Sequence, residues 1–105
     1  MVERYAWHAT ILPGKLDEYM QLYHNIWPEL RAVFAAAGIH NYSIWHDGDK
    51  LFGYYECNSV KYAAMVLHDS PVVAQWKQEL KSLLDLNESR PMGYQKVMEQ
   101  IFFFD

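Results

Sequence analysis

Two tyrosines and a histidine near the start of the chain have the spacing and the chemistry of a proton-exchanging site. Tyr19 and Tyr23 are four residues apart and so share one face of a predicted helix, and His24 lies about 100° around that helix from Tyr23. If this face lines a cleft, the phenols and the imidazole can hydrogen-bond a polar ligand and exchange protons with it. The same residues also suit core aromatics whose polar tips reach the surface, so the spacing leaves both interpretations open.

Two later segments carry side chains that could complete such a site. His40, Tyr42 and His46 share one face of a predicted strand and could meet the helix residues across a cleft, although a half-exposed strand explains them equally well. Trp76 and Lys77 follow on the last predicted helix. An indole can stack on the apolar face of a sugar ring, and an ammonium group can donate to hydroxyls. Trp76 is equally suited to anchor its helix in the core.

Several other chemistries are disfavoured by the sequence. The five histidines lack zinc-type spacing and no carboxylate completes a recognisable triad with them, so we expect no metal. Cys57 is the only cysteine and lies in a predicted strand without a cationic neighbour, which favours a buried structural thiol over a nucleophile. The absence of a glycine-rich phosphate loop and of a Gly-x-Ser-x-Gly element disfavours a dinucleotide-dependent or acyl-transfer enzyme.

The composition predicts a single domain over residues 1–105. Hydrophobic residues make up 51% of the chain and charged residues 21%, which is typical of a chain with a packed core. The net charge is −4 without any run of Lys or Arg, so nucleic acid and anionic membrane surfaces are poor partners. The sequence shows neither a signal-peptide pattern nor an apolar run of the roughly 18 residues that a membrane span needs, and we expect a cytoplasmic protein.

Hydrophobic periodicity and turn signals predict the element order β-α-β-β-α-β. The predicted elements are a strand at 4–12, a helix at 15–37 broken near Pro28, strands at 39–46 and 50–57, helices at 60–68 and 71–85, a loop at 86–95 and a strand at 96–104. This is the ferredoxin-like α+β pattern, a four-stranded antiparallel sheet with helices on one face. Because aromatic residues make up 16% of the chain and lie on both faces of several strands, we expect a second copy to cover the other face. The sequence therefore predicts a homodimer of the dimeric α+β-barrel type.

The same stretches carry a resemblance that spans nearly the whole chain. They are Leu12-Pro13-Gly14, Glu18-Tyr19, Ile26-Trp27-Pro28-Glu29-Leu30, Gly38 through Ile44, Leu51-Phe52-Gly53, and Ser70-Pro71-Val72-Val73 with Trp76. In these segments the chain resembles the L-rhamnose mutarotase family, most specifically in Trp-Pro-Glu-Leu followed by Asn-Tyr-Ser-Ile. The resemblance implies a dimeric ferredoxin-like protein that interconverts the α and β anomers of L-rhamnose without a cofactor.

The resemblance also implies roles for individual residues. The family's helix tyrosine corresponds to Tyr19, its strand tyrosine after asparagine to Tyr42, and the first tryptophan of its pair on the last helix to Trp76. The family's helix histidine, four residues after the tyrosine, falls on Tyr23 here, with His24 one position later. The implied general acid/base is therefore His24, brought into the site by a local bulge in the helix, or Tyr23 in its place.

Two further departures from the family pattern lie at the implied sugar site. The second tryptophan of the pair is Lys77, and the family's Asn-Pro-Asp-Asn-Ser-Pro-like loop is reduced to residues 87–91. We predict a cofactor-independent mutarotase of L-rhamnose or a related deoxy sugar such as L-fucose, whose sugar is bound by Tyr19, Tyr42, Trp76 and Lys77. Two alternatives stay open: a dimeric sugar-binding protein without catalysis, and a cofactor-free monooxygenase of the dimeric α+β-barrel type.

Overall fold

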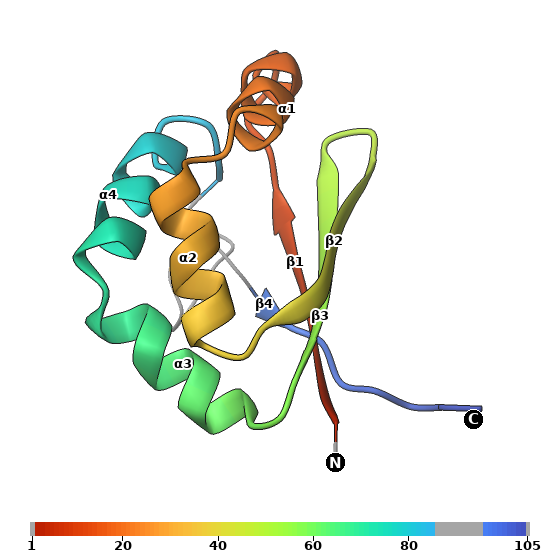
Figure 1. Ribbon diagram of the computed structural model, residues 1–105. Helices are drawn as coiled ribbons and strands as arrows, with labels where there is room; N and C mark the ends of the chain where they lie inside the picture. The colour runs from red at the N-terminus through yellow and green to blue at the C-terminus, as the bar shows by residue number, and fades with distance from the viewer. Residues whose placement is uncertain (1, 86–95, 105) are drawn as a thin grey trace.

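The computed structural model describes residues 2–85 and 96–104, which form four strands and four helices (Figure 1). In chain order these are β1 (Glu3–Thr10), α1 (Leu16–His24), α2 (Pro28–Ala36), β2 (His40–Asp47), β3 (Lys50–Cys57), α3 (Val60–Asp69), α4 (Pro71–Leu80) and β4 (Lys96–Val97). The strands pair antiparallel in the order β2-β3-β1-β4. The helices lie together on one side of this sheet and leave its other side uncovered. The ferredoxin-like α+β prediction is confirmed, with two helices in each predicted helical connection.

Proline and serine set where the helices begin. Pro28 is the first residue of α2, where its missing amide hydrogen is not needed, and the predicted break in the first helix lies at residues 25–27. Before α4, the Ser70 hydroxyl accepts a hydrogen bond from the amide of Val73 at 3.2 Å, and Pro71 is the first helical residue. In the part of the chain that the structure describes, no helix is long and apolar enough to cross a membrane.

The last helix is shorter than the predicted range 71–85. α4 ends at Leu80, and the chain then turns back onto β1, where the amide of Asp85 donates to the carbonyl of Thr10 at 2.8 Å. Hydrogen bonds to β1 thus replace those of another helical turn. Periodicity did not reveal this change because Leu83 is buried here, as it would be on the inner face of a longer helix.

The predicted closing strand at 96–104 forms only at its start. β4 comprises Lys96 and Val97, and the amide of Met98 still donates to the carbonyl of Ala6 at 2.8 Å. The chain then leaves the sheet (Figure 1), and by their exposed surface the side chains of Ile101–Phe104 lie largely in solvent. Aromatic residues favoured a strand here, but the described residues offer this segment no neighbouring strand to pair with.

A bulge interrupts β2 where regular alternation was expected. The register with β3 shifts between His40 and Ser43, and Asn41 has a positive φ of 51°. His40, Asn41 and Tyr42 consequently border the same hollow instead of alternating between the two faces of the sheet.

The core lies between the helices and the covered face of the sheet. Trp7 and Ala9 of β1, and Ile11 just after it, are spaced two residues apart, and all three are buried. The indole of Trp7 lies directly over Gly53 of β3, where a β-carbon would overlap the ring. The indole of Trp7 can lie here only because residue 53 has no side chain.

Candidate functional site

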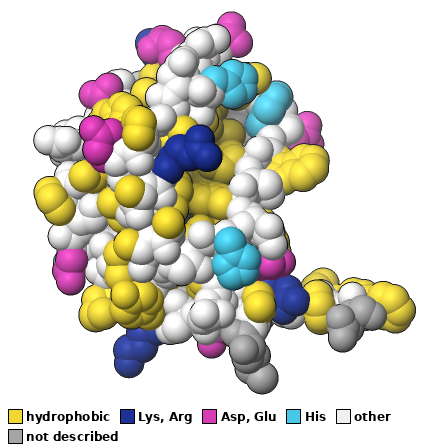
Figure 2. Space-filling model, viewed as in Figure 1, with side chains coloured by type: hydrophobic (Ala, Val, Ile, Leu, Met, Phe, Trp, Pro, Cys, Tyr) yellow, Lys and Arg dark blue, Asp and Glu magenta, His cyan; other side chains and the backbone are white. Residues whose placement is uncertain are grey.

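A cleft of about 750 Å³ opens between α1, α2 and β2, and Figure 2 shows it as a hollow with an apolar floor. Each helix contributes residues spaced three and four apart, and β2 forms the opposite wall. The apolar floor is formed by Leu16, Ile26, Phe34, Ile39, Ile44 and Leu51. The polar lining residues described next come from all three elements.

Tyr19, Tyr23 and His24 enter this cleft together from α1. Tyr19 is 3% exposed and is the deepest of the three, and its ring centroid lies 5.0 Å from that of Tyr23, as their spacing predicts. His24 is the last residue of the helix and is exposed at the rim. Because α1 is α-helical over its full length, His24 reaches the cleft without a local bulge.

Tyr23 contacts the last helix, α4, through Trp76. The indole Nε1–H of Trp76 donates to the hydroxyl oxygen of Tyr23 at 3.3 Å, and the two rings meet edge to face with their centroids 5.2 Å apart. Burial raises the pKa of the Tyr23 phenol, against the opposing effect of hydrogen bonds with Trp76 and Tyr19. Tyr23 therefore stays protonated at neutral pH, and because its oxygen already accepts from Trp76 it is arranged to donate its own proton.

Tyr42 occupies the opposite wall of the cleft, on β2. Its half-buried ring packs against Phe34 of α2 and Tyr55 of β3, with ring centroids 5.4 Å and 5.2 Å away. These contacts hold the Tyr42 phenol at the cleft, so the structure brings it into the same hollow as the three residues of α1.

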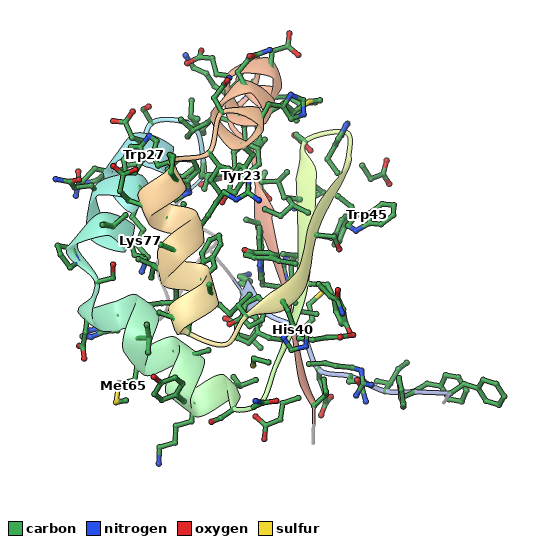
Figure 3. All side chains as sticks on the ribbon, viewed as in Figure 1. Tyr23, Trp27, His40, Trp45, Met65 and Lys77 are labelled. Atoms are coloured by element: carbon green, nitrogen blue, oxygen red, sulfur yellow. The ribbon has the colours of Figure 1, made fainter. Side chains whose placement is uncertain are left out.

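The two predicted residues of the last helix lie outside the cleft lining. Trp76 is 3% exposed and reaches the cleft only through Tyr23, while its ring also meets Trp27 edge to face at a centroid distance of 5.0 Å. Lys77 is exposed on α4, whereas Tyr23 and His40 border the gap between the helices and β2 (Figure 3). The structure thus gives Trp76 an indirect connection to the site, and direct sugar binding by Trp76 and Lys77 stays a prediction.

Arg31 is a lining residue that sequence reasoning missed. It shares a face of α2 with Phe34 and Ala35, which also line the cleft. Its guanidinium is exposed and forms no ion pair with another described residue. Periodicity gave no signal for it, since a charged residue beside an apolar stripe is normally solvated; only the position of β2 opposite α2 reveals that this face borders a cleft.

A hydrogen-bonded carboxylate holds the bulge at the start of β2. The side-chain amide of Asn41 donates to Oε1 of Glu56 at 2.9 Å, and the hydroxyl of Tyr54 donates to Oε2 at 2.7 Å. These two hydrogen bonds hold the pKa of Glu56 below its usual range. Nε2 of His40 lies 3.9 Å from the same carboxylate, so the cluster also orients the two residues that close this end of the cleft.

The fold and the cleft together define a small ferredoxin-like α+β protein. Its pocket has an apolar floor, and phenol and imidazole side chains line its walls. Such a pocket is large enough for a monosaccharide and is suited to proton exchange with it. The family model described as L-rhamnose mutarotase matches residues 4–104. The chain therefore belongs to the L-rhamnose mutarotase family.

Individual relatives agree with this assignment over most of the chain. The L-rhamnose mutarotase of Oceanobacillus iheyensis is 33% identical over 89 residues, which cover 82% of this chain and 84% of that protein. The L-rhamnose mutarotase of Pectobacterium atrosepticum is 30% identical over 106 residues, which cover 97% of this chain and 98% of that protein. The crystal structure of an L-rhamnose mutarotase from Formosa agariphila shares the fold, with a TM-score of 0.82 at 21% identity, covering 98% of this chain and 99% of that one.

Proposed function

We propose that the protein is a mutarotase that interconverts the α and β anomers of L-rhamnose or of a related deoxy sugar such as L-fucose. The observation that carries the proposal is the convergence of Tyr19, Tyr23 and His24 on one wall of the cleft, with Tyr42 on the other. Proton donors and a proton acceptor in one pocket are what this reaction needs. Family membership points to the same activity, and favours it over an oxygenase with the same order of elements.

Mutarotation requires two proton transfers and leaves the composition of the sugar unchanged. A base removes the proton of the anomeric hydroxyl while an acid protonates the ring oxygen. The bond between the anomeric carbon and the ring oxygen breaks, and the anomeric carbon becomes an aldehyde. Rotation of the aldehyde and reversal of both transfers close the ring in the other configuration, so the same acid and base serve both directions.

In this cleft the two roles fall to neighbouring side chains of α1. His24 stands at the rim, and histidine is the side chain that both accepts and donates a proton near neutral pH. Tyr23 stays protonated and donates toward the ring oxygen, as the acid itself or as a hydrogen-bond donor beside His24. Tyr19, deeper in the cleft, hydrogen-bonds the ring oxygen or the anomeric hydroxyl. Tyr42 borders the bound sugar from β2.

The uncovered face of the sheet supports a homodimer. Trp45 is 69% exposed, points away from the helices, and pairs across the strands with the exposed Phe52 (Figure 3). The exposed segment Ile101–Phe104 adds further apolar surface, and its Phe103 ring lies 3.7 Å beneath the guanidinium of Arg4 on β1. A second copy would remove this surface from water, and we propose a cytoplasmic, cofactor-independent homodimer.

The test of this function is NMR exchange spectroscopy of L-rhamnose and L-fucose at anomeric equilibrium, with and without the protein. We expect faster exchange between the anomers of at least one sugar, and a large loss of this effect in His24→Gln. His68→Gln is the matched control, because His68 lies on α3 beside Asp69 and outside the cleft. Saturable sugar binding without faster exchange would identify a binding protein, and oxygen consumption with an aromatic substrate would identify a monooxygenase.

A further inference from the structure

The bulge at the start of β2 lies directly before Tyr42, which borders the cleft. Two residues of β2, Asn41 and Tyr42, lie between register positions that enclose only one residue of β3, Tyr55. Asn41 has a positive φ of 51°, a left-handed conformation that few residues other than glycine adopt. Because Asn41 immediately precedes Tyr42, this conformation sets the direction in which the chain enters Tyr42.

A carboxylate of the neighbouring strand holds Asn41 in this conformation. The side-chain amide of Asn41 donates to Oε1 of Glu56 at 2.9 Å, and the hydroxyl of Tyr54 donates to Oε2 at 2.7 Å. Because these hydrogen bonds hold the pKa of Glu56 below its usual range, the carboxyl group is ionised at neutral pH and both bonds are charge-assisted. An unusual backbone conformation persists where its surroundings hold it, and Glu56 supplies that support here.

Glu56 itself does not line the cleft. Its neighbours along β3, Tyr55 and Cys57, are buried beneath the helices, so the Glu56 side chain points to the opposite face of the sheet. A change at Glu56 therefore reaches a ligand in the cleft through the residues that its carboxylate holds. Asn41 is one of these residues, and the next residue along the chain is Tyr42.

The packing of the Tyr42 ring makes its hydroxyl sensitive to the backbone. The ring contacts Phe34 of α2 and Tyr55 of β3, with ring centroids 5.4 Å and 5.2 Å away. A side chain packed on two sides cannot turn freely to compensate for a shift of its own backbone. A change in the conformation of Asn41 would therefore displace the Tyr42 hydroxyl at the cleft wall.

We infer that Glu56 is a positioning residue for sugar binding: from β3 it holds Asn41, and through Asn41 it sets where the phenol of Tyr42 meets the sugar. This inference rests on the proposed function, in which Tyr42 borders the bound sugar. Glu56 touches no sugar atom and takes no part in the proton transfers. Its removal therefore weakens sugar binding and leaves the acid and base of α1 in place.

The experiment measures kcat and KM for anomer exchange of L-rhamnose and L-fucose by the full chain. Glu56→Ala removes both acceptor oxygens, and Asn41→Gly removes the donor while keeping a residue that adopts a positive φ without strain. We expect each change to raise KM about fivefold, as the loss of one hydrogen bond to the sugar does, with little change in kcat. Glu56→Gln keeps an acceptor oxygen for Asn41 and should retain most of the wild-type affinity. Glu79→Ala, on the exposed side of α4, is the control for loss of a surface carboxylate.

A double-mutant cycle with Tyr42 separates positioning from a general loss of structure. Tyr42→Phe removes the hydroxyl and should itself raise KM about fivefold. If Glu56 acts through that hydroxyl, Glu56→Ala should raise KM no further in the Tyr42→Phe background, because the group that it positions is already gone. Circular dichroism and sedimentation are measured for every variant, so that changes of fold or oligomeric state are recognised.

A second measurement follows the Tyr42 ring without any sugar. Its NMR ring signals are identified by their absence in Tyr42→Phe. We expect them to shift in Glu56→Ala and in Asn41→Gly, because the ring moves relative to the aromatic rings of Phe34 and Tyr55. The ring signals of Tyr62, an exposed residue of α3, should keep their positions.

The outcomes separate this inference from the proposed function. Faster anomer exchange with KM unchanged in both Glu56→Ala and Asn41→Gly would leave the mutarotase function standing and overturn the inference alone. The inference would also be overturned by a rise in KM that persists in full in the Tyr42→Phe background, or by Tyr42 ring signals that do not move. A wild type that exchanges no sugar, with Tyr42 ring signals that shift in both variants, would refute the mutarotase function and support the positioning of Tyr42 by Glu56.

Discussion

The indole nitrogen of Trp76 and the hydroxyl oxygen of Tyr23 are 3.3 Å apart, and this hydrogen bond joins the core of the protein to its cleft. Trp76 is buried on α4, whereas Tyr23 lines the cleft from α1. A core residue thus fixes the direction in which a phenol can donate its proton. It follows that α4 can influence proton transfer by the residues of α1 without contacting the ligand.

Replacing Trp76 by phenylalanine tests this connection. Trp76→Phe keeps an aromatic ring but removes the Nε1–H donor, which contributes about 1 kcal/mol, so we expect kcat for anomer exchange to fall about fivefold with little change in KM. Trp27→Phe is the control, since Trp27, the residue before α2, also contacts the Trp76 ring, with the ring centroids 5.0 Å apart. A rise in KM with an unchanged kcat would instead indicate that Trp76 binds the sugar directly.

The two candidate acid/base residues should separate in their pH profiles. His24→Gln should lower the exchange rate about 100-fold, the usual contribution of a general acid or base, and Tyr23→Phe about tenfold. Burial raises the pKa of Tyr23 above its ordinary value of 10, so its proton is lost only as the pH rises through that higher value. Any loss of rate caused by ionisation of Tyr23 must therefore lie above pH 10. A fall in rate below pH 10 that disappears in Tyr23→Phe would contradict this assignment.

The parts of the site that have local causes could be predicted from the sequence. The spacing of Tyr19 and Tyr23 places them on one helix face whatever surrounds the helix. Pro28 divides the first helical segment because it lacks an amide hydrogen, and the alternation of Trp7 with Ala9 identifies the buried face of β1. Each of these features depends on residues a few positions apart.

The parts with long-range causes could not be predicted. The bulge at Asn41 is held by Glu56, fifteen residues later, and the alternation of β2 gives no sign of it. Arg31 borders the cleft only because β2 passes opposite α2. Trp76 could be read as a core anchor or as a sugar platform, and the distance to Tyr23 was needed to show its place behind the cleft wall. The segment predicted as a loop at 86–95 lies outside the described residues.

A charged residue on the uncovered face of the sheet should dissociate the proposed homodimer. Phe52 is exposed there and pairs with Trp45 on the neighbouring strand. Phe52→Lys places an ammonium group in an apolar interface, so we expect a monomer by light scattering and sedimentation. Tyr62→Lys alters an exposed aromatic residue of the helical layer and should leave the oligomeric state unchanged. A wild-type chain that is monomeric at all concentrations would refute the dimer.

Glu56 should make the folded state sensitive to acid. Its pKa is lowered from the ordinary 4.5, mainly by hydrogen bonds from Asn41 and Tyr54, so the folded state binds a proton less readily than the unfolded chain. The resulting stabilisation is complete above pH 4.5 and is lost as the pH falls through the lower value of the folded state. We expect the free energy of unfolding, measured with urea, to fall more steeply with decreasing pH for the wild type than for Glu56→Gln. Glu79→Gln, on the exposed side of α4, should keep the wild-type slope, whereas identical slopes for all three would contradict the role of Glu56.

The contact between Trp7 and Gly53 should make the sheet intolerant of the smallest side chain. A β-carbon at Gly53 would overlap the indole of Trp7, so Gly53→Ala should lower the free energy of unfolding by about 3 kcal/mol, as overpacking of a rigid core does. Trp7→Phe shortens the ring and removes Nε1, which is buried without a partner among the described residues, so the double variant should recover part of the loss.

A second glycine separates crowding from backbone strain in that experiment. Gly48 has a positive φ of 62° and open space around its α-carbon, so Gly48→Ala should cost about 1 kcal/mol from strain alone. Trp7→Phe should not recover that loss, because the two positions do not contact each other. Urea unfolding of the three single and two double variants gives both coupling energies. Coupling at Gly53 but not at Gly48 would show that the loss at Gly53 comes from crowding against Trp7, whereas the loss at Gly48 comes from backbone strain.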